Sequence, residues 1–195
     1  MKIYLVRHGE TTSNAARVVQ MPDAPLSERG VEQAARLARR LSEAGVASIL
    51  CSTLLRATMT AEHLSSISNV PVTLRADLQE RNYGDIRGLS YDEVGANILD
   101  PDYEPPSGET WREFHQRVDG LWRHLEKLIH DTPAEAAGNL VIVTHGLVLQ
   151  SLVSRRLDTS HLLSVPKGFD NTSVTVVDPQ PPWRVTTVNC TAHLD

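Results

Sequence analysis

The stretch Ile3-Tyr4-Leu5-Val6-Arg7-His8-Gly9-Glu10 decides how the rest of this 195-residue chain is interpreted. Its first four residues are apolar and indicate a short buried strand, and Arg7 and His8 follow where that strand ends. A planar guanidinium matches the oxygens of a phosphoryl group, and a neutral imidazole can attack phosphorus. The stretch therefore predicts a strand that brings a phosphate-binding cation and a nucleophile to one place.

A second stretch, Leu140-Val141-Ile142-Val143-Thr144-His145-Gly146, repeats the pattern of an apolar run that ends in His-Gly. Ligands of open α/β sheets collect outside the carboxyl ends of the strands, so we expect His8 and His145 to converge there. Two further candidates follow short strand-like runs. Arg56 enters a helical pattern after residues 49–51, and Glu80 lies in a loop after residues 72–74.

Hydrophobic periodicity predicts an α/β fold with a mostly parallel sheet. Apolar runs at residues 3–6, 48–51, 72–74 and 140–143 alternate with helical patterns, as in βαβ units. One helix is expected to begin at Ser27 and to bury a single face, which comprises Val31, Ala34, Ala35, Ala38 and Leu41. A longer apolar stripe at helical spacing runs from Trp111 to Leu128. Residues 174–177 and 184–188 are expected to close the sheet as an edge hairpin.

Composition favours one soluble enzyme domain over residues 1–195. Hydrophobic residues make up 41%, and 24 acidic against 19 basic residues give a net charge of −5 without any basic run. Nucleic acid is therefore an unexpected partner, and no stretch predicts a membrane segment or signal peptide. Two cysteines, Cys51 and Cys190, provide no disulfide framework, so we expect a cytoplasmic protein. Exposed apolar positions on the terminal hairpin would permit a homodimer.

Taken in order, the motifs resemble the histidine phosphatase superfamily, in the branch of cofactor-dependent phosphoglycerate mutases and phosphatases such as alpha-ribazole phosphatase and broad-specificity enzymes. The resemblance covers nearly the whole chain. It rests on Arg7-His8-Gly9-Glu10-Thr11 with Asn14, Asp23-Ala24-Pro25-Leu26-Ser27 with Gly30, Ser52, Arg56-Ala57, Thr60-Ala61, Glu80, Tyr83-Gly84-Asp85, Gly108-Glu109-Thr110, Thr144-His145-Gly146 and Asn171-Thr172-Ser173. Thr11-Thr12 after Glu10 disfavours the acid phosphatase branch, and we interpret that branch's His-Asp pair, here His130-Asp131, as the end of a surface helix.

The resemblance implies a three-layer α/β/α architecture and a metal-free mechanism without a cofactor. His8 would form a phosphohistidine, while Arg7, Arg56 and His145 would supply positive charge. Glu80 would act as general acid and then as general base, with a pKa raised by partial burial. Substrate contacts are expected from Arg7, Arg56 and His145, and further from Asn14, Tyr83 and Gly146. The segment 88–108 would form an insertion or lid over the site.

Each candidate also has a plain structural alternative. Arg56 could be a salt-bridged helix residue, Glu80 a solvated loop carboxylate, His145 a satisfied strand-end histidine, and Asn14 a helix cap with Ser13. Tyr83 and Arg81 are either substrate contacts or loop anchors. The order of the motifs favours the catalytic interpretation over these alternatives.

Hydrolysis of a small phosphate monoester is the predicted reaction. Residues 88–111 contain no Lys or Arg but six acidic side chains, whereas a mutase must hold a substrate with several anionic groups. We therefore expect the part of the substrate outside the phosphate to be neutral, polar or cationic. The alternatives are a phosphoglycerate mutase-type phosphotransferase and a non-catalytic phosphate-binding module. Ile86-Arg87-Gly88, where relatives often have Trp-Glu-Gly, and Gln20-Met21, where they often have a glycine, depart from the family pattern.

Overall fold

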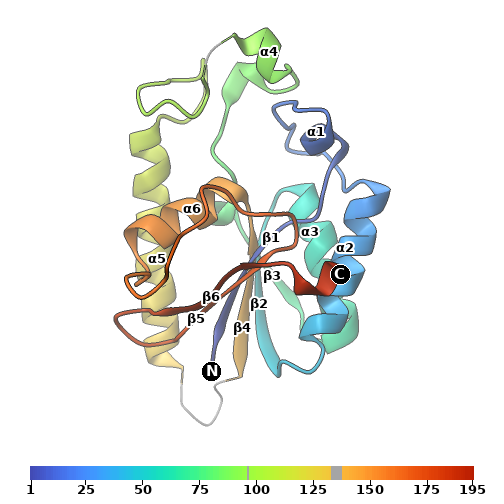
Figure 1. Ribbon diagram of the computed structural model, residues 1–195, viewed down its shortest axis with the longest axis vertical. Helices are drawn as coiled ribbons and strands as arrows, with labels where there is room; N and C mark the ends of the chain where they lie inside the picture. Colours follow the sequence, from blue (N-terminus) through green and yellow to red (C-terminus); the bar gives the residue numbers. More distant parts are fainter. Residues whose placement is uncertain (96, 133–137) are drawn as a thin grey trace.

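The computed structural model describes residues 1–95, 97–132 and 138–195, and it arranges them around a six-stranded sheet of order β3-β2-β4-β1-β5-β6 (Figure 1). The strands are β1 (Ile3–Arg7), β2 (Val46–Ser52), β3 (Val72–Arg75), β4 (Asn139–Thr144), β5 (Val174–Val177) and β6 (Val185–Cys190). β1 and β4 therefore occupy the middle of the sheet, where both faces can be covered.

The sheet is parallel except at one edge. β1 pairs with β4, β4 with β2 and β2 with β3 in parallel, whereas β5 is antiparallel to β1 and β6 is antiparallel to β5. The four parallel strands therefore direct their carboxyl ends to the same end of the molecule. This topology confirms the predicted mostly parallel α/β sheet with a C-terminal edge hairpin.

Helices cover both faces of the sheet and complete the three expected layers (Figure 1). α2 (Glu28–Leu41) and α3 (Leu55–Ser68) share a core with Val6 of β1, while α5 (Trp111–Asp131) and α6 (Gly146–Arg155) share the other core with Leu5. Because both faces are buried, β1 is apolar at successive positions rather than alternating. No helix in the described ranges is both long and apolar enough to cross a membrane.

Two helices differ from the expected pattern of burial. α2 begins as predicted, with Ser27 as N-cap accepting the N–H of Gly30 at 3.0 Å, but Val31 is 36% exposed and Leu37 lies in the core. In α5, Leu128 is 39% exposed. Both exposed residues lie in a terminal turn of their helix, where fewer neighbouring elements cover the helix surface.

The segment 88–108 lies above the carboxyl ends of the strands, near the short helix α1 (Thr12–Ala15) (Figure 1). It contains the short helix α4 (Tyr91–Val94), and residue 96 within it lies outside the described residues. Backbone hydrogen bonds join it to Val19, whose N–H donates to Leu89 at 2.9 Å and whose carbonyl accepts from Gly88 at 2.7 Å. Whether the segment acts as a lid stays a prediction.

Close backbone packing positions the residues that follow β1. A Cβ added at Gly30, in the first turn of α2, would lie 2.0 Å from the carbonyl oxygen of Glu10, and one at Gly9 would lie 2.7 Å from the carbonyl oxygen of Gly30. Two main-chain segments therefore meet here without room for a side chain. The contact fixes the backbone next to His8.

We expect Gly30→Ala to destabilise the fold by about 1–3 kcal/mol, because the new methyl group overlaps backbone that cannot rotate away. Thermal unfolding would measure the change. The matched control is Gly120→Ala in α5, where an added Cβ meets only Arg123 Nη2 at 3.9 Å. That variant should gain about 0.5–1 kcal/mol from lower backbone entropy in the unfolded chain. Equal effects of the two substitutions would contradict the packing argument.

Candidate active site

His8 and His145 lie side by side at the carboxyl ends of two neighbouring strands. The parallel register pairs Arg7 of β1 with Thr144 of β4, so the following residue of each strand leaves the sheet at the same level. The centroids of the two imidazole rings are 5.1 Å apart, and both side chains are buried. The two strand-end histidines therefore converge, as the strand pattern indicated.

Hydrogen bonding orients His8 with one ring nitrogen toward the backbone. Nδ1 lies 2.7 Å from the carbonyl oxygen of Gly9, and because a carbonyl only accepts, Nδ1 carries the proton. The N–H of Gly9 in turn donates to Oγ1 of Thr60 at 3.0 Å. Nε2 of His8 therefore keeps its lone pair and is the nitrogen able to act as a nucleophile.

Ser52 sets the tautomer of His145 from the end of β2. Its hydroxyl lies 2.7 Å from Nε2 of His145 and also accepts the N–H of Leu54 at 3.3 Å. Within the described ranges the Ser52 hydroxyl has no acceptor other than Nε2, so it donates its proton there, and the His145 proton is then on Nδ1. Ser52 belonged to the motif pattern, but the sequence assigned it no role.

The guanidinium groups of Arg7 and Arg56 are held by backbone carbonyls rather than by carboxylates. Nη1 of Arg7 donates to the carbonyl of Phe169, and Nη1 of Arg56 donates to the carbonyl of Met21 at 3.2 Å. Gly146, the first residue of α6, lies against the Arg7 guanidinium, since a Cβ there would be 3.7 Å from its Nε. The salt-bridged-helix alternative for Arg56 is therefore not what the structure contains.

Three buried side-chain nitrogens have no hydrogen-bond partner within the described ranges, namely Arg7 Nε, Arg56 Nε and His145 Nδ1. A buried donor without an acceptor costs free energy, and native structures rarely leave one unpaired. Three such donors beside His8 suit a ligand with several acceptor oxygens and negative charge. A phosphoryl group has these properties.

Both imidazoles are neutral near pH 7. Burial lowers the pKa of His8 well below its ordinary value, and the charges of Arg56 and Arg7 lower it further. Burial is also the largest cause that lowers the pKa of His145, followed by Arg56 and His8. His145 is thus a neutral N–H donor in the free protein and not the fixed positive charge that we expected, because burial, reinforced by the charge of Arg56, disfavours the imidazolium.

Glu80 contributes a carboxyl group from the loop after η1 (Ala76–Leu78). Its Oε1 accepts the N–H of Arg81 at 3.0 Å, and its Oε2 accepts the N–H of Leu147 in α6 at 3.1 Å. Burial raises the pKa of Glu80, and these two N–H groups and the arginines Arg56 and Arg7 only partly offset the increase. A carboxyl with a raised pKa is what a general acid near neutral pH requires.

Arg117 of α5 holds the loop that carries Glu80. Its guanidinium donates to the carbonyls of Asp77 and Gln79 at 2.9 and 2.8 Å, and it pairs with Glu109 at 2.8 Å. Glu109 also accepts the N–H of Asn82 at 3.1 Å. No local sequence signal identified this ion pair, because Arg117 and Glu109 meet the loop that carries Glu80 only in the folded structure.

Arg81 is a loop anchor, which resolves one alternative that the sequence left open. Its buried guanidinium donates to three carbonyls, those of Glu109 at 2.9 Å, Ile98 at 3.2 Å and Tyr103 at 2.7 Å. It also lies 4.1 Å from the centroid of the Trp111 ring. Arg81 directly follows Glu80, and its bonds to Ile98 and Tyr103 therefore hold the 88–108 segment next to Glu80.

Asn14 and Tyr83 line the same cavity as His8. Asn14 is the third residue of α1 and its side chain helps to cap that helix, as the structural alternative proposed, but the N-cap is Thr11 and not Ser13. Its Oδ1 accepts the N–H of Thr11 at 3.3 Å and lies 3.4 Å from Nδ2 of Asn171, so the Asn14 amide presents its NH₂ group as the remaining donor. Burial raises the pKa of Tyr83, which therefore stays protonated.

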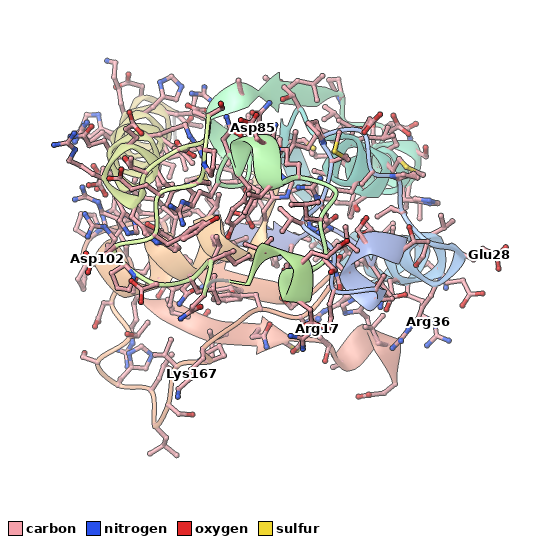
Figure 2. All side chains as sticks on the ribbon, turned by 90° about the horizontal axis from the view of Figure 1, so that it is seen from above. Arg17, Glu28, Arg36, Asp85, Asp102 and Lys167 are labelled. Carbon is pink, nitrogen blue, oxygen red and sulfur yellow. The ribbon has the colours of Figure 1, made fainter. Side chains whose placement is uncertain are left out.

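The predicted candidates Arg7, His8, Asn14, Arg56, Glu80, Tyr83 and Gly146 line one cavity of about 240 Å³. His145 lies buried next to His8. Figure 2 looks onto this end of the molecule, where Asp85, Asp102 and Lys167 lie around the periphery. Within the described ranges, no group of three or more His, Cys, Asp or Glu side chains is suited to hold a metal ion. Metal independence itself stays a prediction.

Comparison with known families assigns residues 3–191 to the histidine phosphatase superfamily, branch 1. Among curated proteins, the chain is 32% identical over 211 residues to the Cronobacter sakazakii protein named "Probable phosphoglycerate mutase GpmB", with coverage of 100% of this chain and 95% of that protein.

Solved structures of two phosphatases are similar over nearly the whole chain. The alpha-ribazole phosphatase of Shigella flexneri is 25% identical with a TM-score of 0.82, and coverage is 98% of this chain and 97% of that one. A mycobacterial glucosyl-3-phosphoglycerate phosphatase in complex with VO3 is 26% identical with a TM-score of 0.81, and coverage is 97% and 98%.

Removal of the Ser52 hydroxyl tests the geometry of His145. We expect Ser52→Ala to weaken binding of inorganic phosphate about fivefold to tenfold, because His145 loses the partner that keeps its proton on Nδ1. Calorimetry measures the affinity, and ¹⁵N chemical shifts of the imidazole report the tautomer. Ser66→Ala, at an exposed position of α3, is the matched control. An unchanged tautomer in Ser52→Ala would refute the assignment.

Proposed function

The chain belongs to the histidine phosphatase superfamily, branch 1, and from this membership we propose that it hydrolyses a small phosphate monoester through a phosphohistidine on His8. The observation that carries the proposal is the group of unpaired buried donors, Arg7 Nε, Arg56 Nε and His145 Nδ1, beside a neutral imidazole. Such donors favour a bound phosphoryl group, and the neutral imidazole provides the nucleophile. Phosphatases among the similar structures support the same reaction.

In the first step, Nε2 of His8 attacks phosphorus while the bond from phosphorus to the ester oxygen breaks. Arg7, Arg56 and the Nδ1–H of His145 donate to the three oxygens that stay on phosphorus. Because these donors are held by carbonyls and by Ser52 before the substrate arrives, little reorganisation is needed during the reaction. The product of this step is a phosphohistidine and an alcohol.

Glu80 supplies the proton that the departing alkoxide needs. Its raised pKa favours the protonated carboxyl, and a bound phosphate offsets the nearby charges of Arg56 and Arg7 that would otherwise favour ionisation. Substrate binding therefore helps to keep the acid protonated. After the alcohol leaves, the Glu80 carboxylate is ready to accept a proton.

In the second step, water attacks the phosphohistidine and the bond between Nε2 and phosphorus breaks. Glu80 takes a proton from the water, inorganic phosphate leaves, and His8 regains its neutral form. The protein thereby returns to its starting protonation states. None of these steps requires a metal ion or an organic cofactor.

Phosphoryl transfer between hydroxyl groups is the second candidate, since a relative with 32% identity is named a probable phosphoglycerate mutase. A mutase must keep water from the phosphohistidine and must hold a substrate that carries several anionic groups. Cations for such a substrate would have to come from outside the 88–108 segment, whose described residues include no Lys or Arg. We favour hydrolysis because two of the similar solved structures are phosphatases, and product analysis separates the two reactions.

We also propose a cytoplasmic location. Cys51 and Cys190 are both free thiols, and Cys51 is buried in β2, so neither contributes the covalent cross-links common in oxidising compartments. Comparison of cell fractions by immunoblot would test this location.

Release of phosphate from p-nitrophenyl phosphate in the presence of EDTA tests the proposed reaction. We expect turnover by the native protein, loss of at least about 10³-fold in His8→Ala because the nucleophile is gone, and no loss in His124→Ala on the exposed surface of α5. Because the bond between phosphorus and an imidazole nitrogen is labile in acid, a rapid quench in alkaline denaturant followed by mass spectrometry at neutral to alkaline pH should detect the phosphorylated His8 peptide.

Each result separates the candidates. Turnover that requires an added metal would reject the metal-free mechanism. Transfer to phosphoglycerate with little free phosphate would favour a mutase. Phosphate binding without turnover of any monoester would favour a non-catalytic binding module.

The loss of kcat on substitution of Glu80 should depend on the leaving group of the ester. We expect Glu80→Gln to lower kcat about 10²–10⁴-fold for alkyl phosphates, since a poor leaving group needs a proton, and much less for p-nitrophenyl phosphate. Glu104→Gln, an exposed carboxylate in the 88–108 segment, is the control. An equal loss for both classes of ester would show that Glu80 does not donate the proton.

The pH profile for alkyl phosphates follows from the same pKa shifts. Because the pKa of Glu80 is raised, its protonated form persists to higher pH, and kcat should fall as the pH rises through that pKa. The pKa of His8 is lowered, so its protonation should not reduce activity near pH 6.5. Stopped assays between pH 4 and 9 would measure the change of kcat on the acidic limb and on the alkaline limb of the pH profile. Retention of the alkaline limb in Glu80→Gln would contradict the assignment.

A further inference from the structure

The cavity contains two cations that the proposed chemistry does not use, Arg87 and Lys167. Arg87 follows η2 (Gly84–Ile86), and Lys167 lies in the loop between α6 and β5. The two residues come from distant parts of the sequence and border the same space as His8. Neither lies within 88–111, the segment whose lack of Lys and Arg suggested a neutral, polar or cationic substrate.

The charges that line the cavity do not balance around a simple phosphate. Among the described residues that line the cavity, Glu80 is the only one with a carboxylate. Arg7 and Arg56 suffice to offset a phosphate dianion, and the Arg81 guanidinium is already committed to backbone carbonyls. Arg87 and Lys167 therefore remain as two positive charges for which a monoester with a neutral remainder offers no partner.

Among the described residues, no carboxylate forms an ion pair with either cation. Neither Arg87 nor Lys167 has a carboxylate oxygen within salt-bridge distance, although eight such contacts occur elsewhere in the described ranges. In Figure 2, Asp85 and Asp102 both lie away from Lys167. Arg87, which is partly exposed, and Lys167, which is exposed, therefore line the cavity without such a partner.

Arg87 lies close enough to act together with the phosphoryl site. Its side chain is only partly exposed, and its charge is one of the causes that, after burial, lower the pKa of Arg56 to about 10. This electrostatic contact between two arginines is unfavourable in the empty cavity. An anion that spans the two positions would relieve it.

We infer that the substrate carries a second anionic group, a carboxylate or a further phosphoryl group, which Arg87 and Lys167 bind at the open side of the cavity. This inference rests on the proposed phosphatase function and narrows its substrate class to anionic phosphate monoesters. It replaces the expectation of a neutral or cationic remainder. That expectation was based on residues 88–111 alone, whereas Arg87 precedes this segment in the sequence and Lys167 follows it.

Matched phosphonates test the second site without requiring turnover. Calorimetry would compare 3-phosphonopropionate and 4-phosphonobutyrate with propyl- and butylphosphonate, which lack the carboxylate. We expect the native protein to bind the better-fitting carboxylate compound at least about fivefold more tightly than its alkyl counterpart, as for a partly buried charged hydrogen bond. The preference should weaken as ionic strength rises.

Charge-removing variants assign the preference to residues. Arg87→Gln and Lys167→Gln should each reduce the preference, which is the ratio of the two affinities measured in one variant, and the double variant should abolish it. A general weakening of phosphonate binding by the lost charge affects both ligands and cancels in this ratio. Arg123→Gln removes one positive charge from the exposed face of α5 and should leave the preference unchanged. Equal binding of the paired ligands by the native protein, or a preference that survives the double variant, would overturn the inference.

Turnover of p-nitrophenyl phosphate by the same preparations keeps the two proposals separate. Turnover without a carboxylate preference would reject the second anionic site and retain the phosphatase. A carboxylate preference without turnover of any monoester would retain the site and reject the phosphatase.

Discussion

Parallel pairing of β1 with β4 is the constraint on which the site depends. It places the residues after Arg7 and Thr144 at one level, so two histidines that are far apart in sequence face each other with ring centroids 5.1 Å apart. Because helices cover both faces of these strands, a ligand finds its place outside the carboxyl ends, as in other open α/β sheets. The arginines, the Glu80 loop and the segment 88–108 all assemble around that position.

Uncompensated positive charge in a buried place gives the site its chemistry. Arg7 and Arg56 lie beside His8 without a carboxylate partner, and together with burial they keep both imidazoles neutral. The same burial raises the pKa of Glu80 despite two N–H donors. A nucleophile without a proton and an acid with one can therefore coexist at the same pH, because their surroundings shift the two pKa values in opposite directions.

Local patterns predicted the elements well where both faces or one face of an element are buried. The apolar runs became β1 to β4, and Ser27 caps α2 as expected. Predictions were weaker at the ends of helices, where Val31 and Leu128 are exposed although their spacing suited the core. Periodicity describes which face of a helix is apolar, but it contains no information on how far the neighbouring elements extend.

The fold class and the main chemical groups follow from the amino-acid sequence, since strand-end His-Gly motifs, Arg56 and Glu80 are recognisable from local pattern and from order along the chain. The orientation and charge of those groups depend on tertiary contacts. Ser52 sets the proton of His145, Arg117 holds the Glu80 loop, and Arg87 and Lys167 add positive charge to the cavity. These effects depend on distances and burial between segments that are remote in sequence, and hydrogen bonds and electrostatic fields act through space rather than along the chain.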